Sequence, residues 1–287
     1  MPTDPLSKLF FESYGSTNPE TIVFLHGGGV SGWMWRQQAR SLQADYHCLI
    51  PDLPGQGKSS PFDSEPFTIE RAAARIALFV RSQAHSGRAH VVGLSEGAQV
   101  LVSLLSQSPE VVDHAVISSA LLRPLAPRWL VSRTLFDLSY RLFIAPWKSN
   151  DGWIRLNMRY STGIPDAYYQ DFKRSFQETT QASWTKLMLA NLSFRMPEGL
   201  DRVKQPVLVI VGEKEHKQMK QSAKDLVRAL PNAPGVVLSL GEKATLAQEH
   251  NWALTAPQLF TDTIRAWVEN RPLPAQLKPL SLPANLP

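Results

Sequence analysis

The chain has 287 residues, of which 43% are hydrophobic and 19% are charged, a composition typical of folded proteins and not of disordered ones. It contains one cysteine, Cys48, which excludes an intramolecular disulfide. The formal net charge of +5 is concentrated in residues 121–200, where 11 Lys and Arg stand against 6 Asp and Glu. Because these basic residues are scattered among aromatic ones, without a nucleic-acid-reading motif, we expect no nucleic-acid partner. A weak attraction to anionic ligands or to a membrane surface is compatible with this charge.

Hydropathy along the chain argues against a membrane-spanning protein. A bilayer-spanning helix requires a run of about 18 apolar residues, and the sequence has none. The first 15 residues contain no basic region followed by an apolar one, so the sequence predicts no signal peptide and a cytoplasmic location.

Short apolar runs and helix-like stretches alternate along most of the chain. Seven runs rich in β-branched residues predict strands, at residues 9–14, 21–25, 46–50, 89–92, 114–118, 207–211 and 236–239. Apolar residues at helical spacing predict helices at 69–80, 95–107, 219–230 and 257–270. This alternation predicts an α/β fold with a mostly parallel central sheet and helices on both faces.

The alternation stops between residues 123 and 198, which we interpret as a helical cap. This segment has no clear strand and holds 13 of the 26 aromatic residues. The predicted α/β core is then discontinuous, with residues 1–122 and 199–270 on either side of the cap. Residues 271–287 contain five prolines, so we expect an extended, mobile tail.

Aromatic residues of the cap are expected to line a mostly apolar substrate pocket on its underside. Arg133, Arg141 and Arg155 are expected on the outer face. The predicted pocket residues are Trp129, Phe136, Tyr140, Phe143, Trp147 and Trp153.

The motif Gly93-Leu94-Ser95-Glu96-Gly97 directly follows one predicted strand and precedes a predicted helix. A tight turn in this setting strains the middle residue and lifts its hydroxyl clear of the sheet, while the glycines allow close packing around it. The N–H groups of the following helix point at any anion that forms there. Ser95 is therefore the predicted nucleophile.

A glycine-rich turn, Gly27-Gly28-Gly29, follows the strand at residues 21–25 and lets backbone N–H groups approach a substrate oxygen. We expect the amides of Gly28 and Glu96 to form an oxyanion hole. The Glu96 carboxylate either repels anionic substrates or makes a buried structural hydrogen bond.

A serine nucleophile needs a base and an acid that orients the base. His250 follows the last predicted strand, at the sheet edge where ligands bind in open α/β folds, and is the predicted base, with His216 as the alternative. Glu215 is the predicted acid, with Glu213 and Glu249 as alternatives. No histidines have metal-ligand spacing, so we expect no metal.

These motifs together resemble the α/β-hydrolase superfamily over about residues 8–270. The resemblance also rests on Trp35 after the glycine-rich turn and on the stretch from Asp52 to Ser59, Asp-Leu-Pro-Gly-Gln-Gly-Lys-Ser. It implies an α/β-hydrolase fold with an inserted cap. Two positions depart from the family pattern, because Glu215 stands where aspartate is usual and Glu249 where glycine usually precedes the histidine.

The predicted function is that of a cofactor-free serine hydrolase. We expect it to cleave a carboxylic ester of a medium-sized, largely apolar small molecule through an acyl-enzyme on Ser95. One alternative is a thioester hydrolase, a C–C bond hydrolase or a lyase that uses the same three residues. Another is a ligand-binding receptor or pseudoenzyme with negligible turnover.

Overall fold

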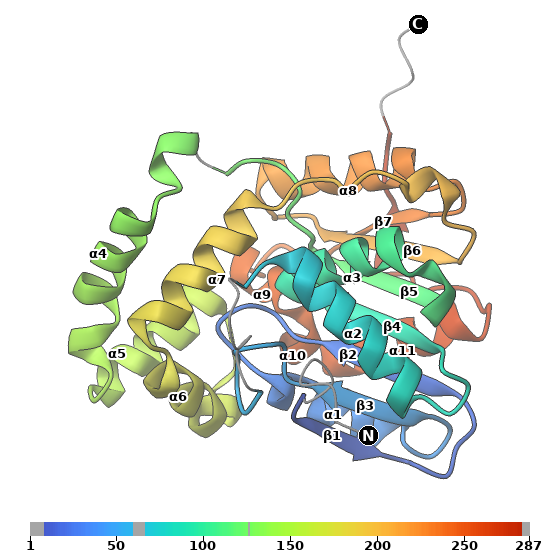
Figure 1. Cartoon of the computed structure of the whole chain (residues 1–287), viewed down its shortest axis with the longest axis horizontal. Coiled ribbons are helices and arrows are strands. Elements are labelled where there is room, and N and C mark those ends of the chain that lie inside the picture. Colours follow the sequence, from blue (N-terminus) through green and yellow to red (C-terminus); the bar gives the residue numbers. More distant parts are fainter. Residues whose placement is uncertain (1–8, 60–66, 126, 283–287) are drawn as a thin grey trace, which may run out of the picture.

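The computed structural model describes residues 9–59, 67–125 and 127–282. One sheet of eight strands, in the order β1-β3-β2-β4-β5-β6-β7-β8, runs through these residues (Figure 1). The six inner strands are parallel, whereas β1 and β8 pair antiparallel with β3 and β7 at the two edges. The strands are β1 Phe11–Tyr14, β2 Thr21–Leu25, β3 His47–Pro51, β4 Ala89–Leu94, β5 Val112–Ser118, β6 Val207–Gly212, β7 Gly235–Leu238 and β8 Leu277–Pro279.

Helices cover both faces of the sheet because its inner strands are apolar on both sides. In β2, Val23 and Leu25 pack with helices α2 (Ile69–Gln83), α3 (Glu96–Gln107) and α8 (Lys217–Ala229). The alternate residues Ile22 and Phe24 pack on the other face, with α1 (Arg36–Leu42), α10 (Trp252–Thr255) and α11 (Pro257–Val268). A side-chain period of two residues therefore builds two separate cores from one strand.

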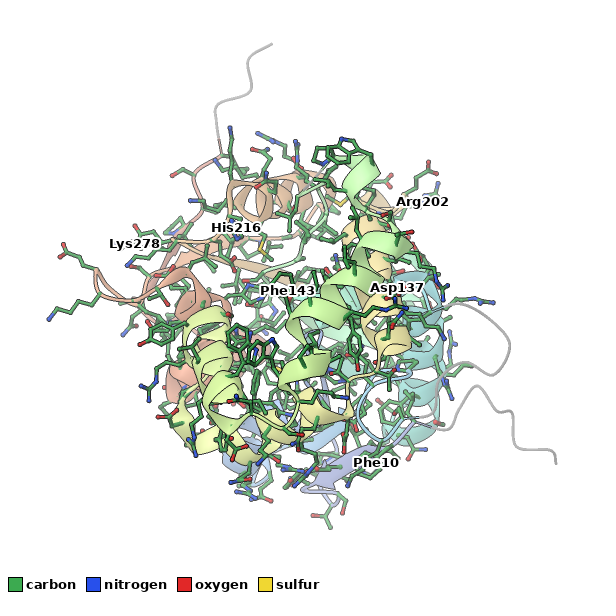
Figure 2. The ribbon with its side chains drawn as sticks, turned by 90° about the vertical axis from the view of Figure 1, so that its left-hand side faces the viewer. Phe10, Asp137, Phe143, Arg202, His216 and Lys278 are labelled. Carbon is green, nitrogen blue, oxygen red and sulfur yellow. The ribbon has the colours of Figure 1, made fainter. Side chains whose placement is uncertain are left out.

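Among its described residues, the chain between β5 and β6 forms helices and connecting loops but no strand, and we call residues 123–198 the cap segment. It lies to one side of the sheet, with α4 outermost (Figure 1), and Figure 2 views it from that side. Its elements are η4 Arg128–Leu130, α4 Arg133–Phe143, η5 Ala145–Trp147, α5 Asp151–Leu156, η6 Asn157–Thr162, η7 Asp166–Tyr168, α6 Tyr169–Glu178 and α7 Gln181–Ser193.

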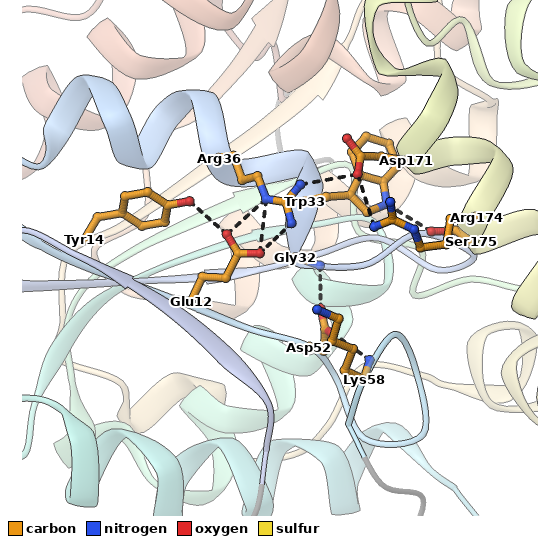
Figure 3. A network of polar contacts seen from close by, with 10 residues as sticks. All are labelled: Glu12, Tyr14, Gly32, Trp33, Arg36, Asp52, Lys58, Asp171, Arg174 and Ser175. Atoms are coloured by element: carbon orange, nitrogen blue, oxygen red, sulfur yellow. Dashed lines mark hydrogen bonds and ion pairs between the residues drawn. The ribbon is translucent and has the colours of Figure 1, made fainter.

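Helix α6 of the cap segment is tied to the core by a polar network (Figure 3). Arg36 donates three hydrogen bonds to the Glu12 carboxylate and a fourth, of 3.3 Å, to Asp171 of α6. The Trp33 indole N–H donates to the Ser175 hydroxyl at 3.0 Å. These contacts fix helix α6 against the core.

The predicted α/β fold with a helical insertion is confirmed, and all seven predicted strands are present within a few residues of their predicted ends. The expectation of a mobile tail is wrong for Leu277–Pro279, which form β8 against β7. Residues 283–287 of the predicted tail lie outside the described residues.

Candidate active site

Ser95 lies at the turn between β4 and α3 in a strained backbone conformation, with φ 57° and ψ −112°. L-residues other than glycine rarely adopt such angles, and the surrounding structure must hold them in place. A Cβ on Gly97 would lie 2.1 Å from the Leu25 carbonyl oxygen, and one on Gly93 would lie 2.4 Å from the Gly97 oxygen. The turn therefore requires glycine at both flanking positions, and it leaves the serine half-buried.

His250 and Glu215 meet beyond the carboxyl ends of the strands. Glu215 lies in the turn after β6, and His250 ends the short helix α9 (Leu246–His250). His250 Nδ1 donates to Glu215 Oε1 at 2.8 Å, and the Glu215 side chain is fully buried. Because this bond places the proton on Nδ1, Nε2 is the free acceptor of the neutral ring. Within the described ranges, the Ser95 hydroxyl makes no hydrogen bond to His250.

The alternative acids and the alternative base have other partners. Glu213 accepts a hydrogen bond from the Ser239 hydroxyl at 2.6 Å. Glu249 is buried and accepts from the backbone N–H groups of Lys214, at 2.6 Å, and of Leu240, at 3.2 Å. The exposed His216 precedes α8. Among these described contacts, the His250 imidazole thus bonds to the carboxylate of Glu215 and not to that of Glu213 or Glu249, while Glu249 braces the loop that carries Glu215.

The glycine-rich turn after β2 lies beside the serine. A Cβ on Gly27 would lie 3.6 Å from Ser95 Cβ, and one on Gly28 would lie 2.8 Å from Glu96 Oε2. His26 fixes this turn, because its Nε2 accepts from the Leu53 N–H and its Nδ1 donates to the Gly27 carbonyl, each at 2.8 Å. Burial lowers the pKa of His26, so the ring is a neutral structural bridge.

The Glu96 carboxyl is completely buried at this point. Gln56 donates a hydrogen bond to its Oε1, and Asn191 of α7 donates to its Oε2 at 3.4 Å. Burial raises the pKa of Glu96 to about 7, although the two hydrogen bonds act in the opposite direction. The side chain therefore joins the turn at Ser95, the loop of Gln56 and the cap segment without a cationic partner among its described contacts.

A cavity of about 880 Å³ extends from Gly28 under the cap segment. Neither Ser95 nor His250 belongs to its wall, which meets the turn of Ser95 through Gly28. Its exposed wall is mainly apolar and includes the aromatic side chains of Phe67, Phe143, Trp153, Phe172, Phe176 and Trp184. Phe172, Phe176 and Trp184 were not among the predicted pocket residues, although they share the aromatic signal of the cap segment with them.

Two of the six predicted pocket residues, Phe143 and Trp153, line this cavity. The expectation needs correction for the other four. Trp129 is exposed, Phe136 is buried outside the cavity wall, and the Tyr140 hydroxyl donates to the Thr179 carbonyl. Trp147 stacks on Trp153 with the ring centroids 4.7 Å apart, so it supports the wall from behind.

The described parts of the chain contain no group of three or more His, Cys, Asp or Glu side chains that could hold a metal ion. No helix in them is long and apolar enough to cross a membrane.

Known proteins are similar to this chain in sequence or in fold. An AB hydrolase superfamily protein of Gibberella zeae is 38% identical over 108 residues, which are 37% of this chain and 38% of that protein. The uncharacterized hydrolase YugF of Bacillus subtilis is 26% identical over 267 residues, covering 91% of this chain and 94% of that protein. The structure of a thermophilic esterase from Thermogutta terrifontis matches with a TM-score of 0.71 at 19% identity, covering 91% of this chain and 93% of that one.

The alpha/beta hydrolase family matches residues 22–276, a range that includes Ser95, Glu215 and His250. The predicted resemblance is thus confirmed over most of the sequence, and the chain belongs to the alpha/beta hydrolase family.

Proposed function

We propose that this hydrolase cleaves a carboxylic ester of a medium-sized, largely apolar molecule through an acyl-enzyme on Ser95. The observation that carries the proposal is the 2.8 Å hydrogen bond between His250 and the buried Glu215, at the same sheet edge as the strained serine. This geometry supports the predicted roles of nucleophile, base and acid, in the chain order Ser95, Glu215, His250 that this fold uses.

In the proposed reaction the Ser95 hydroxyl attacks the ester carbonyl while His250 Nε2 takes its proton. Glu215 keeps the imidazole in the required tautomer and stabilises the imidazolium that forms. The same imidazolium then gives its proton to the leaving alcohol. Water attacks the acyl-enzyme in a second step, again with His250 as base, and frees the acid.

The backbone amides of Gly28 and Glu96 are the proposed oxyanion hole. Neither N–H donates a hydrogen bond to another group among the described residues, and Gly28 lies directly against Glu96. Glu96 is also the first residue of the 12-residue helix α3, whose N-terminal partial positive charge favours the negative oxygen of the tetrahedral intermediate.

The substrate class is inferred from the cavity. Its volume of about 880 Å³ is in the range of sites for small organic molecules, and its wall is mainly apolar. The similar Thermogutta terrifontis structure is named an esterase, which agrees with ester cleavage but supports it only as a likeness of fold. We therefore propose an uncharged ester with a medium-sized apolar or aromatic part.

A fluorophosphonate probe tests the nucleophile, together with a series of p-nitrophenyl esters of increasing chain length. We expect labelling at Ser95 only, and its loss in Ser95→Ala, while Ser161→Ala on the cavity wall remains labelled. The Ser95→Ala change should also lower the turnover number by on the order of 10⁶-fold.

Two results would contradict the proposal. Labelling that persists in Ser95→Ala would remove Ser95 as the nucleophile. A protein that is labelled but turns over no ester in the series would point to one of the alternative reactions or to a binding protein.

A further inference from the structure

The exposed hydrophobic side chains of this protein are concentrated on one part of the cap segment. Among the residues that the structure describes, nine large hydrophobic side chains are exposed, and eight of them lie between residues 125 and 160. The most exposed are Trp129 at 74%, Tyr160 at 73% and Phe143 at 61%. Single exposed leucines are ordinary, but a set this local is typical of an interaction surface.

The net charge of the protein lies in the same stretch, residues 123–162, which we call the outer cap layer. It holds 7 Lys and Arg against 2 Asp and Glu, whereas the rest of the chain holds 23 against 23. The side chains of Arg133 and Arg159 are 75% and 61% exposed, although Arg133 lies 3.9 Å from Asp137 and Arg159 pairs with Asp166 at 2.5 Å. Arg141 donates a hydrogen bond to the Gln181 side chain. The layer is therefore apolar and cationic at once.

Helix α4 presents two different faces. On its inner face Phe136 is buried, and the Ser139 hydroxyl accepts from the Trp184 indole of α7 at 2.9 Å. On its outer face lie three exposed leucines at helical spacing, Leu135, Leu138 and Leu142. No described element lies beyond α4 in Figure 1, and Figure 2 looks onto this helix from outside. The inner face thus holds the helix in place, and within the described part of the chain it leaves these leucines partly exposed.

We propose that the outer cap layer docks on the surface of an anionic lipid bilayer. A helix with exposed leucines and flanking arginines has the pattern of an interfacial helix, which lies in the headgroup region without crossing the membrane. Trp129 and Tyr160 are the residue types that favour this depth. The arginines keep their charged ends at the anionic headgroups while their stems cover apolar surface.

A second copy of the chain is a poorer occupant of this surface. Two-fold association would bring the outer cap layer against itself, so that its excess of Lys and Arg would face an equal excess. Such self-repulsion opposes association, whereas the same charge attracts an anionic membrane. The charge distribution therefore selects the bilayer.

The surface also adjoins the cavity. Phe143 and Ser161 are both exposed on the outer cap layer, and both also line the cavity wall. A hydrophobic molecule dissolved in the bilayer would meet the cavity at Phe143. The docking itself does not depend on the reaction that follows.

Co-sedimentation of the full chain with vesicles tests the docking. We expect binding to phosphatidylcholine vesicles that contain phosphatidylglycerol, weak binding to phosphatidylcholine alone, and loss of binding at high salt. Replacing Arg133, Arg141 and Arg159 by Gln should weaken binding on the order of 100-fold, since each cation near an anionic surface contributes about a factor of five. The double change Leu138→Gln and Leu142→Gln should weaken it about tenfold or more.

Matched controls lie outside the outer cap layer. Leu282→Gln changes the ninth exposed hydrophobic residue, and the triple change of Lys217, Lys243 and Lys278 to Gln removes three exposed cations. Both should bind vesicles as the unmodified chain does. Equal weakening by cap and control variants, or equal binding to both vesicle types, would overturn the proposal. So would a dimer in solution that the double leucine change converts to a monomer, because the face would then be a subunit interface.

Discussion

Histidines stand at both ends of the strands of the central sheet, which we call its carboxyl edge and its amino edge, and they differ in the group that faces them. Beyond the carboxyl ends of the strands, His250 Nδ1 bonds to Glu215 at 2.8 Å. At the amino ends, His90 of β4 and His114 of β5 place their Nδ1 atoms 3.2 Å apart. A carboxylate stabilises a protonated imidazole, whereas a second imidazole and burial oppose protonation.

The consequence is a division of roles between the two edges. Burial, helped by the neighbouring His114, lowers the pKa of His90 to about 4, and burial also lowers the pKa of His114. These rings are neutral at neutral pH and serve packing. The carboxyl edge collects the loops after β4, β6 and β7, so groups far apart in the sequence meet there. The role of each histidine therefore depends on the group that faces its ring and on the end of the strands at which it lies.

The largest expected effect is at the carboxyl edge. His250→Ala removes the proposed base and should lower the turnover number by on the order of 10⁶-fold, as loss of the serine does. His216→Ala should leave most activity, because the His216 side chain is exposed and the imidazole that bonds to the Glu215 carboxylate among the described residues is that of His250. Steady-state hydrolysis of a neutral p-nitrophenyl ester measures both. A greater loss in His216→Ala would make that residue the base.

The acid is tested by a matched pair of substitutions. Glu215→Gln should lower turnover about 10⁴-fold, since an amide can no longer favour the imidazolium or the required tautomer. Glu213→Gln should change it little, because Glu213 bonds to Ser239 at an exposed site. The variant with the larger loss identifies the acid, and equal losses would remove the distinction between the two.

The choice among these glutamates marks the limit of what the sequence predicts. Ser95 is recognisable because a local turn chemistry, glycine on either side after a strand, determines its geometry. The acid depends on a contact between loops 35 residues apart, and three glutamates lie near the right strand ends. Only the structure separates the one that meets His250 from the one that accepts the Lys214 N–H.

The cap segment and the last strand were harder to predict for similar reasons. Helix α4 has apolar residues on two faces, so periodicity cannot tell which of them, Phe136 or Leu138, turns inward. Strand β8 has only three residues and exists because β7 offers an open edge, a non-local cause that local propensity does not contain.

Substitution of His90, at the amino edge, should change the stability of the protein and not its activity. With the unfolded pKa near 6.5 and the folded pKa of His90 near 4, only the unfolded chain binds this proton between those values. Stability contributed by the neutral ring is therefore complete above pH 6.5 and is lost as the pH falls towards 4, by up to about 3 kcal/mol. The free energy of unfolding can be measured with urea at several pH values. Over this window it should change less steeply with pH in His90→Gln than in the unmodified chain.

The control for this prediction is His216→Gln, which changes an exposed histidine at the carboxyl edge. It should leave the pH dependence of the free energy of unfolding unchanged. Turnover of His90→Gln at neutral pH should match the unmodified chain. An unchanged slope in His90→Gln, or a large loss of its turnover, would break the division between the two edges.

The smallest expected effect concerns Glu96, a buried acid at the catalytic edge. Because burial raises its pKa to about 7, the carboxyl gains its negative charge as the pH rises through neutrality. Its Oε2 lies against Gly28, where the cavity meets the turn of Ser95. An anionic ester should therefore be disfavoured relative to a neutral one by on the order of tenfold above pH 7, and less below it.

The change Glu96→Gln keeps the backbone amide and removes the charge, so it separates the two roles that the sequence left open. If the charge filters substrates, this variant should hydrolyse neutral esters within a few-fold of the unmodified chain and should lose the pH-dependent preference against anionic ones. Glu213→Gln removes an exposed carboxylate instead and should keep that preference. If Glu96→Gln lowers both ester classes equally, the bonds to Gln56 and Asn191 matter more than the charge. Glu96 would then act as a brace between the cap segment and the catalytic turn, as a buried carboxyl held by two amides can do.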